Sequence, residues 1–204
     1  MALESVLITG CSSGGIGSSL ALAFHASGLH VFATARDVSK LEHLAHLPNI
    51  TILPLDVTSV PSISAAVEVV KKTNDGKLKY LVNNSGRGMV MPLLDVDIEE
   101  AKKLYDVNLW GPLIVTKAFA ELIVENKGTV VLVGSSAGVM GFAWTGKCIF
   151  HLISSSPHLY YSFTTLRNIT NNTGRNLQRL QSLPQPPRLH PSSRTRTTRR
   201  KSGN

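Results

Sequence analysis

The first 133 residues alternate between short apolar segments and longer amphipathic segments, and this alternation limits the possible folds most. Short apolar, often β-branched runs suit strands buried on both faces, and the segments between them have helical spacing. Strands are expected at residues 5–9, 30–35, 51–55, 80–83 and 128–133, and helices at 16–27, 38–47, 60–73 and 98–125. The last region could be one extended helix or two, with a break at Gly111 and Pro112. This pattern predicts an α/β fold, a doubly wound parallel sheet with strand order 3-2-1-4-5.

The charge of the chain changes sharply near residue 146. Residues 1–146 contain 11 Lys/Arg and 13 Asp/Glu, a net charge of −2, whereas residues 147–204 contain 10 Lys/Arg and no acidic residue, a net charge of +10. The second segment is rich in Ser, Thr, Asn, Pro, Gln and Arg without a regular period, which is typical of disorder. We therefore predict an incomplete α/β domain over residues 1–146, truncated after its fifth strand, and a disordered basic tail over residues 147–204.

The remaining composition argues against several classes of partner. No aromatic residues lie among the tail arginines to stack on bases, so no nucleic-acid partner is expected. Cys11 and Cys148 are too few and too far apart for a disulfide framework or a metal site. No transmembrane segment is expected, and Glu4 near the N-terminus argues against a signal peptide. A cytoplasmic protein is the expectation.

A glycine-rich loop joins the first expected strand to the first expected helix. Its backbone N–H groups and the positive end of the following helix could bind a pyrophosphate, and glycine permits the close approach. An ordinary tight turn is the alternative interpretation. The candidate nucleotide-binding residues of this loop are Thr9, Gly10, Ser12, Ser13, Gly14, Gly15, Ile16 and Gly17.

Arg36 follows the second expected strand, at the position that faces the adenosine ribose in such folds. An acidic residue there would accept hydrogen bonds from a free 2′-hydroxyl and repel a 2′-phosphate. A guanidinium can instead pair with a phosphate through two parallel hydrogen bonds. Arg36 therefore favours NADP(H) over NAD(H), although an ordinary surface arginine is the alternative.

The loop resembles the Thr-Gly-x-x-x-Gly-x-Gly motif of the short-chain dehydrogenase/reductase family, whose fold is of the Rossmann type. It has one extra residue between its last two glycines, and this departure resembles a branch that includes NADPH-dependent 1-acyldihydroxyacetone-phosphate reductases. The resemblance implies that Asp56 and Val57 hold the adenine ring. It also implies that the segment from Asn83 to Gly86, similar to the family's Asn-Asn-Ala-Gly, closes the floor of the cofactor cleft.

The resemblance supplies two catalytic candidates, Asn108 and Ser135, with Ser136 as an alternative to Ser135. The family asparagine anchors a water in a proton relay, and the family serine donates a hydrogen bond to the substrate oxygen. The family also uses a tyrosine about thirteen residues after the serine, followed four residues later by a lysine. Here those positions are Cys148 and Leu152, and the second half of the chain contains no Tyr-x-x-x-Lys.

One hypothesis for this absence comes from the genetic code. The codons for Gly146, Lys147 and Cys148 can contain GTAAGT, a common start of a eukaryotic intron, and a shifted frame from Leu177 can encode Tyr-Asn-Ala-Ser-Lys. Residues 147–204 would then be a translated intron followed by an out-of-frame exon. A genomic sequence without GTAAGT after Gly146 would exclude this hypothesis.

These features predict an NADPH-dependent carbonyl reductase acting on a small-molecule or lipid-like substrate. The resemblance makes 1-acyldihydroxyacetone phosphate, used in glycerolipid synthesis, one candidate. The alternative is a catalytically inactive nucleotide-binding remnant or a mis-spliced product. A homodimer or tetramer, and a peripheral location at the endoplasmic reticulum or lipid droplets, are further implications of the resemblance.

Overall fold

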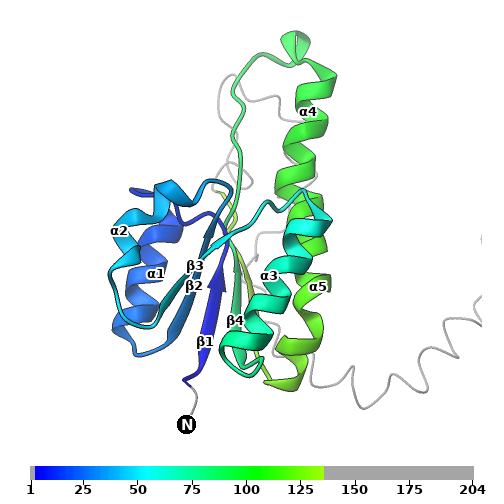
Figure 1. Cartoon of the computed structure of the whole chain (residues 1–204). Helices are drawn as coiled ribbons and strands as arrows, with labels where there is room; N and C mark the ends of the chain where they lie inside the picture. Colours follow the sequence, from blue (N-terminus) through cyan, green and yellow to red (C-terminus); the bar gives the residue numbers. More distant parts are fainter. Residues whose placement is uncertain (1–2, 136–204) are drawn as a thin grey trace, which may run out of the picture. The chain divides into compact units, whose positions relative to one another are not determined.

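The computed structural model describes residues 3–135 and contains one sheet of five parallel strands (Figure 1). All four strand pairs are parallel, and the strand order is β3-β2-β1-β4-β5, which confirms the predicted doubly wound sheet. The strands are β1 (Ser5–Ile8), β2 (His30–Ala35), β3 (Ile50–Pro54), β4 (Leu78–Asn83) and β5 (Thr129–Leu132). The predicted tail over residues 147–204, and the domain boundary at 146, lie outside the described residues.

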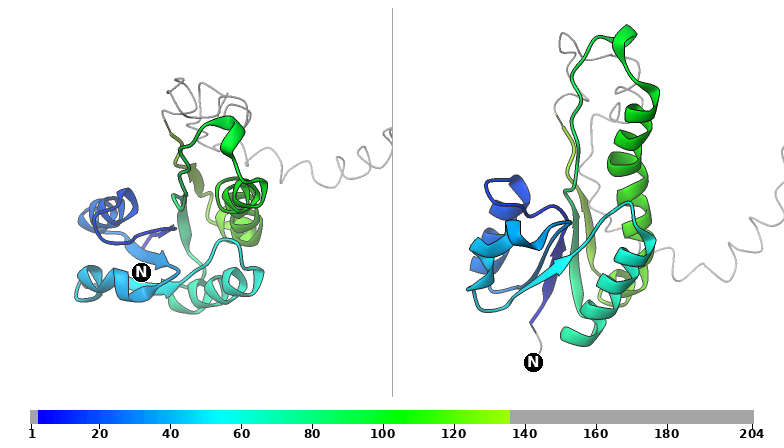
Figure 2. Two further views of the ribbon diagram at one scale, coloured as in Figure 1. Left: turned by 90° about the horizontal axis from the view of Figure 1, so that it is seen from above. Right: turned by 45° about the horizontal axis from the view of Figure 1, so that its top comes forward.

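Helices cover both faces of this sheet (Figures 1 and 2). One face is covered by α1 (Ile16–Ala26), the 3₁₀ turn η1 (Val38–Leu41) and α2 (Glu42–Ala45). The other face is covered by α3 (Val60–Thr73) and α5 (Gly111–Glu125). The remaining elements are the 3₁₀ turn η2 (Leu93–Asp95), α4 (Ile98–Tyr105) and the π-helical turn η3 (Asp106–Trp110). Figure 1 shows α4 continuing the line of α5 beyond the end of the sheet.

The core forms two layers because successive strand residues point to opposite faces of the sheet. Leu7 is fully buried in the layer beneath α3 and α5, whereas its neighbours Val6 and Ile8 are fully buried in the layer beneath α1 and α2. On β2, Phe32 lies in the layer beneath α3 and α5, and Val31 lies in the layer beneath α1 and α2. Burial on both faces explains why the strands appear in the sequence as nearly continuous apolar runs.

The region from Val38 to Leu47 differs from the single helix predicted there. It forms the short turn η1 followed by only four residues of α-helix in α2. The Asp37 carboxylate accepts hydrogen bonds from the Ser39 backbone N–H at 3.1 Å and from Ser39 Oγ at 2.7 Å, which caps a tight 3₁₀ turn. Pro48 follows shortly after α2 and disfavours helical conformation in the residue before it. Apolar spacing alone predicted one helix over residues 38–47, but local capping favours a 3₁₀ turn and a shorter α-helix there.

Instead of the break expected at Gly111 and Pro112, the structure has the wider π-helical turn η3, so the chain remains helical from α4 to α5. The Gly111 N–H donates to the carbonyl oxygen of Asp106, five residues earlier, as in a π-helix. Pro112 has no N–H, so it cannot form the α-helical bond to the carbonyl of Asn108, four residues earlier. The proline therefore explains why the irregular turn includes Asn108.

Within residues 3–135, the helical stretch Ile98–Glu125 is long and apolar enough to cross a membrane by length and composition alone. The expectation that no segment reaches this length therefore needs correction. In this structure the α5 part of the stretch buries Val115, Phe119 and Ile123 in the core layer next to β4. Packing against the sheet accounts for the apolar residues on that face of α5.

Candidate functional site

A cleft of about 700 Å³ lies at the carboxyl ends of the strands and is lined by loops that follow β1, β2, β3 and β4. In open parallel sheets, ligands bind at this edge where the strand order reverses, and the volume is in the range of small-molecule sites. Eight predicted cofactor-binding residues line it: Gly10, Ser12, Gly15, Ile16, Arg36, Asp56, Val57 and Gly86. Asn84 and Ser85, from the segment expected to close the floor of the cleft, also line it. The other lining residues are Ala35, Leu55, Thr58, Arg87, Lys103, Asp106 and Val107.

The glycine-rich loop depends on glycine at three positions, for different reasons. Gly10 and Gly14 have φ angles of +75°, in the left-handed region that favours glycine. A Cβ on Gly17 would lie 2.4 Å from the Gly10 carbonyl oxygen, so only glycine lets α1 approach the loop this closely. A Cβ on Gly14 would meet no described atom within 4 Å. The loop is thus tight where it meets α1 and open at Gly14.

The N-terminus of α1 is suited to an anion. Gly15 is its N-cap, and among the described residues no side chain caps this end and no acidic residue lies in the first turn. The first N–H groups of a helix have no partner within the helix and carry partial positive charge. Gly15 and Ile16 line the cleft, so this positive end borders it. The Ser13 N–H instead donates to the Lys40 carbonyl at 3.1 Å, which ties the loop to η1.

Thr9 and Asn84 join the glycine-rich loop to the end of β4. The buried Thr9 Oγ1 accepts hydrogen bonds from the backbone N–H groups of Asn84 and Ser85, both at 2.9 Å. Asn84 Nδ2 donates to the carbonyl oxygens of Thr9 at 2.9 Å and Gly10 at 3.0 Å. Asn84 therefore positions the loop, a role that the adjacent pair of asparagines in the sequence did not reveal.

Asn83 has a different role from Asn84 and lies outside the cleft lining. It is the last residue of β4 and is buried, and its Nδ2 donates to Thr116 Oγ1 on α5 at 3.1 Å. Its Oδ1 is buried with no hydrogen-bond partner in the part of the chain that the structure describes. Asn83 thus connects the end of β4 to α5.

Arg36 and Asp56 lie at the end of the cleft formed by the loops after β2 and β3. Arg36 is exposed, while its neighbour Asp37 caps η1 and is not among the lining residues. The Asp56 carboxylate accepts hydrogen bonds from the Thr58 N–H at 2.9 Å and from Thr58 Oγ1 at 2.7 Å. The bond from the Thr58 N–H lowers the pKa of Asp56 most, and the nearby charge of Arg36 lowers it further. This end therefore holds one ionised carboxylate and one guanidinium.

The two catalytic candidates lie at separate places near the β4 and β5 ends. The Asn108 side chain, in η3, accepts a hydrogen bond from the Arg87 N–H and donates one to the Arg87 carbonyl, both at 2.8 Å. Ser135 lies in the exposed loop after β5 and is the last described residue. Neither is among the lining residues of the cleft. Ser136, Cys148 and Leu152 lie outside the described residues.

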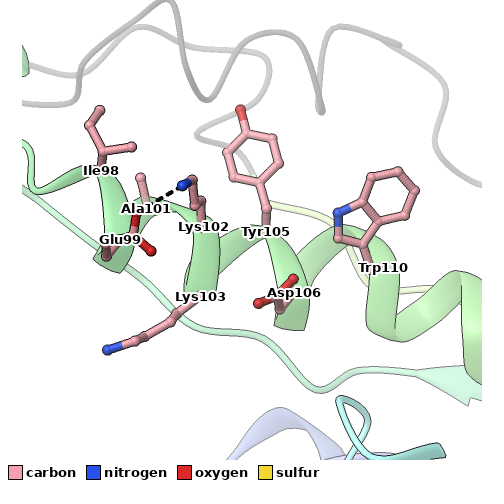
Figure 3. A pocket seen from close by; sticks show the side chains of 8 residues that line it. All are labelled: Ile98, Glu99, Ala101, Lys102, Lys103, Tyr105, Asp106 and Trp110. Atoms are coloured by element: carbon pink, nitrogen blue, oxygen red, sulfur yellow. Dashed lines mark hydrogen bonds and ion pairs between the residues drawn. The ribbon is translucent and has the colours of Figure 1, made fainter.

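A second hollow, of about 540 Å³, lies along α4 (Figure 3). Figure 3 shows Tyr105 and Trp110 projecting from one side of the helix, with Lys103 pointing away from them. Lys103 and Asp106 border both hollows, but no residue of the glycine-rich loop borders this one. The features suited to a nucleotide therefore all lie in the larger cleft.

Comparisons with known proteins agree with this geometry. A family model described as short chain dehydrogenase matches residues 4–147. The short-chain dehydrogenase PC-15 of Penicillium crustosum is 48% identical over 146 residues, which cover 72% of this chain and 54% of that protein. The NADPH-dependent 1-acyldihydroxyacetone phosphate reductase of Schizosaccharomyces pombe is 43% identical over 159 residues, covering 78% of this chain and 52% of that protein.

Solved structures show the same fold. The structure titled "ElxO with NADP Bound" superposes with a TM-score of 0.65 at 26% identity, covering 76% of this chain and 63% of that one. The chain spans about half the length of the curated relatives it matches. The family match covers more than half of the chain, with the glycine-rich loop and the strand order of the structure in agreement. The chain belongs to the short-chain dehydrogenase family.

Proposed function

We propose that the cleft binds NADP(H), and that the chain is the nucleotide-binding part of an NADPH-dependent carbonyl reductase. The observation that carries this proposal is the combination, in one cleft, of the loop at Gly10 and Gly15, the uncapped N-terminus of α1 and the Arg36 guanidinium. The names of the Schizosaccharomyces pombe relative and of the ElxO structure, which mention NADPH and NADP, support the same cofactor.

Three parts of the dinucleotide, its pyrophosphate, its 2′-phosphate and its adenine ring, have complementary regions in the cleft. The pyrophosphate would meet the N–H groups at the start of α1, beside Gly15 and Ile16. Arg36 would pair with the 2′-phosphate, and the loop containing Asp56 and Val57 would hold the adenine ring. The candidates Thr9, Gly17 and Asn83 would act indirectly, because they shape and support the loop.

When bound, NADPH supplies a hydride to a carbonyl carbon, and the carbonyl oxygen then needs a hydrogen-bond donor and a proton. Ser135 would donate a hydrogen bond to that oxygen. Asn108 would hold the loop at Arg87 in place through its two hydrogen bonds. The 1-acyldihydroxyacetone phosphate reductase among the relatives motivates a lipid-like carbonyl substrate and, with it, a location at endoplasmic reticulum or lipid-droplet surfaces.

A second candidate function is nucleotide binding without turnover. The sequence favours it, since none of the four tyrosines, Tyr80, Tyr105, Tyr160 and Tyr161, is followed four residues later by a lysine. Proton donation near neutral pH needs a group whose pKa is tuned to that range. NADPH oxidation with 1-acyldihydroxyacetone phosphate, measured on this chain, distinguishes the two candidates. Turnover at rates typical of enzymes favours the reductase, and binding without turnover favours the second candidate.

The cofactor assignment is tested by isothermal titration calorimetry of the full chain with NADPH and NADH. Arg36→Ala should weaken NADPH binding by about 10- to 100-fold, because charged hydrogen bonds to the 2′-phosphate are lost. NADH lacks that phosphate, so its affinity should change less than about twofold. Lys72→Ala is the matched control, since Lys72 is an exposed cation near the C-terminus of α3 and outside the cleft. Equal effects of Arg36→Ala on both nucleotides would contradict the assignment.

A further inference from the structure

Two adjacent residues of opposite charge, Arg36 and Asp37, follow β2. At this end of the second strand, a carboxylate can accept a hydrogen bond from the free 2′-hydroxyl of NAD(H), and it repels the 2′-phosphate of NADP(H). A guanidinium has the opposite preference, because it pairs with the phosphate. The two positions therefore hold one group suited to each nucleotide, and their placement decides which of the two faces the ligand.

The structure separates these two charges. Arg36 lines the cleft, whereas Asp37 does not. The Asp37 carboxylate instead caps η1, where its Oδ1 accepts hydrogen bonds from the Ser39 N–H at 3.1 Å and from Ser39 Oγ at 2.7 Å. Both bonds lower the pKa of Asp37, the bond from Ser39 Oγ most. The group held in the cap is therefore an ionised carboxylate at neutral pH.

The neighbouring charges follow the same division. Among the described residues, Lys40 in η1 is the cation whose charge lowers the pKa of Asp37. The charge of Arg36 instead lowers the pKa of Asp56, which lines the cleft. Asp37 thus has an opposite charge within its own turn, and Arg36 acts on the side of the cleft.

The turn η1 is also fixed to the glycine-rich loop. The Ser13 N–H donates to the Lys40 carbonyl at 3.1 Å, and the Lys40 N–H donates to the Asp37 carbonyl at 3.3 Å. Ser39 itself is exposed. Removal of its hydroxyl therefore frees the Asp37 carboxylate from its shorter bond without disturbing the core or the backbone bonds of the turn.

We infer that Ser39 is a positioning residue for the choice of cofactor: it holds the Asp37 carboxylate in the cap of η1 and so leaves Arg36 to face the 2′-phosphate. This inference rests on the proposed function, because it assumes NADP(H) in the cleft. Consecutive Cα atoms lie about 3.8 Å apart, so a carboxylate released by Ser39 stays within about one Debye length of the position next to Arg36. There it repels a 2′-phosphate and accepts a hydrogen bond from a free 2′-hydroxyl.

The test is calorimetric titration of the full chain with NADP⁺ and NAD⁺, with the ratio of the two dissociation constants as the readout. Ser39→Ala should weaken NADP⁺ binding by about 3- to 10-fold, because the released carboxylate lies near the phosphate. NAD⁺ binding should stay the same or become up to about threefold tighter. Ser39→Thr keeps a hydroxyl and should retain the preference of the unaltered chain. Damage to the fold alone would weaken both nucleotides and leave the ratio unchanged.

Asp37→Asn provides the background that isolates the charge, because asparagine can cap a helix end but carries no charge. Alone, it should change the ratio by less than about twofold, since Ser39 already holds the carboxylate. Adding Ser39→Ala to Asp37→Asn should leave the ratio unchanged, because no charge is released. Ser27→Ala is the matched control. Ser27 is exposed at the C-terminal end of α1, outside the cleft, and its Oγ donates to the Ala23 carbonyl at 2.9 Å.

Three results would contradict this account. A ratio that Ser39→Ala leaves unchanged, in a chain that prefers NADP⁺, would overturn the role of Ser39 and leave the proposed function standing. An equal fall of the ratio by Ser39→Ala with and without Asp37→Asn would show that Asp37 is not the group released. No binding of either nucleotide to the unaltered chain, or no preference between them, would overturn the proposed function and this inference together.

Discussion

At the residue scale, the cleft depends on a few hydrogen bonds that cross from one strand to another. Two such bonds join Thr9, which follows β1, to Asn84, which follows β4. A third joins Asn84 to Gly10, and a fourth joins Ser85 to Thr9. Thr9 and Asn84 are 75 positions apart in the sequence, so their contact depends on how the sheet assembles. The structure thus gives Asn84 a definite task that motif spacing could not assign.

Cys11 provides a prediction at this scale. Its side chain is buried beneath the loop, its thiol donates to the Ile8 carbonyl at 3.3 Å, and burial raises its pKa to about 11. Because the thiolate is the reactive form, Cys11 should stay protonated and unreactive from neutral pH up to roughly pH 10. Alkylation by iodoacetamide at pH 8, followed by peptide mass spectrometry, should be at least about 100-fold slower in the folded protein than in guanidinium chloride. Equal rates would show that the thiol is not buried.

Single residues also show what the sequence could and could not predict about the site. Gly10, Arg36 and Asp56 follow the ends of three strands, and those ends meet at one edge of a parallel sheet, so their proximity followed from the strand pattern. The motifs did not single out Arg87, and Lys103 gave no signal of this kind. Arg87 lies in the loop after β4, beyond the asparagine motif, and Lys103 lines the same cleft from α4, which extends beyond the sheet (Figure 1).

At the element scale, β2 and α3 have the bounds that the sequence predicted, because each is an uninterrupted segment with clear end signals. Ser59 caps α3 by accepting a hydrogen bond from Ser62 N–H at 3.4 Å, and Pro61 lies in its first turn. The sequence left open one helix or two over residues 98–125, with a break at Gly111 and Pro112, because a proline can either end or kink a helix. The structure has a π-helical turn at Asp106–Trp110 instead. Beyond this turn the helix continues as α5, which buries Val115, Phe119 and Ile123 in the core.

The glycine-rich loop provides a prediction at the element scale. Gly17→Ala should destabilise the fold by about 2–3 kcal/mol, because the new methyl group would collide with the Gly10 carbonyl. Gly14→Ala should cost about 1 kcal/mol, since it is strained by its left-handed φ but meets no described atom. Urea unfolding of both variants measures the difference. A larger loss for Gly14→Ala would contradict the described packing of α1 against the loop.

At the scale of the whole molecule, the described sheet ends at β5, and the chain spans about half the length of its curated relatives. Within residues 3–135, β5 has a neighbour on one side only, β4. An apolar edge strand can pair with other chains, so a chain in which β5 keeps this single neighbour is expected to be poorly soluble and to aggregate. Size-exclusion chromatography with light scattering checks this. A monodisperse sample with a sharp cooperative melt would contradict the prediction.

The central claim for the molecule is that one cleft recognises a dinucleotide by its pyrophosphate and its 2′-phosphate. The most direct measurement is calorimetric titration of the purified chain with NADPH and with NADH under identical conditions. The account predicts that NADPH binds at least about 10-fold more tightly, because only its 2′-phosphate can pair with Arg36. Equal affinity for the two nucleotides, or no binding of either, would contradict it.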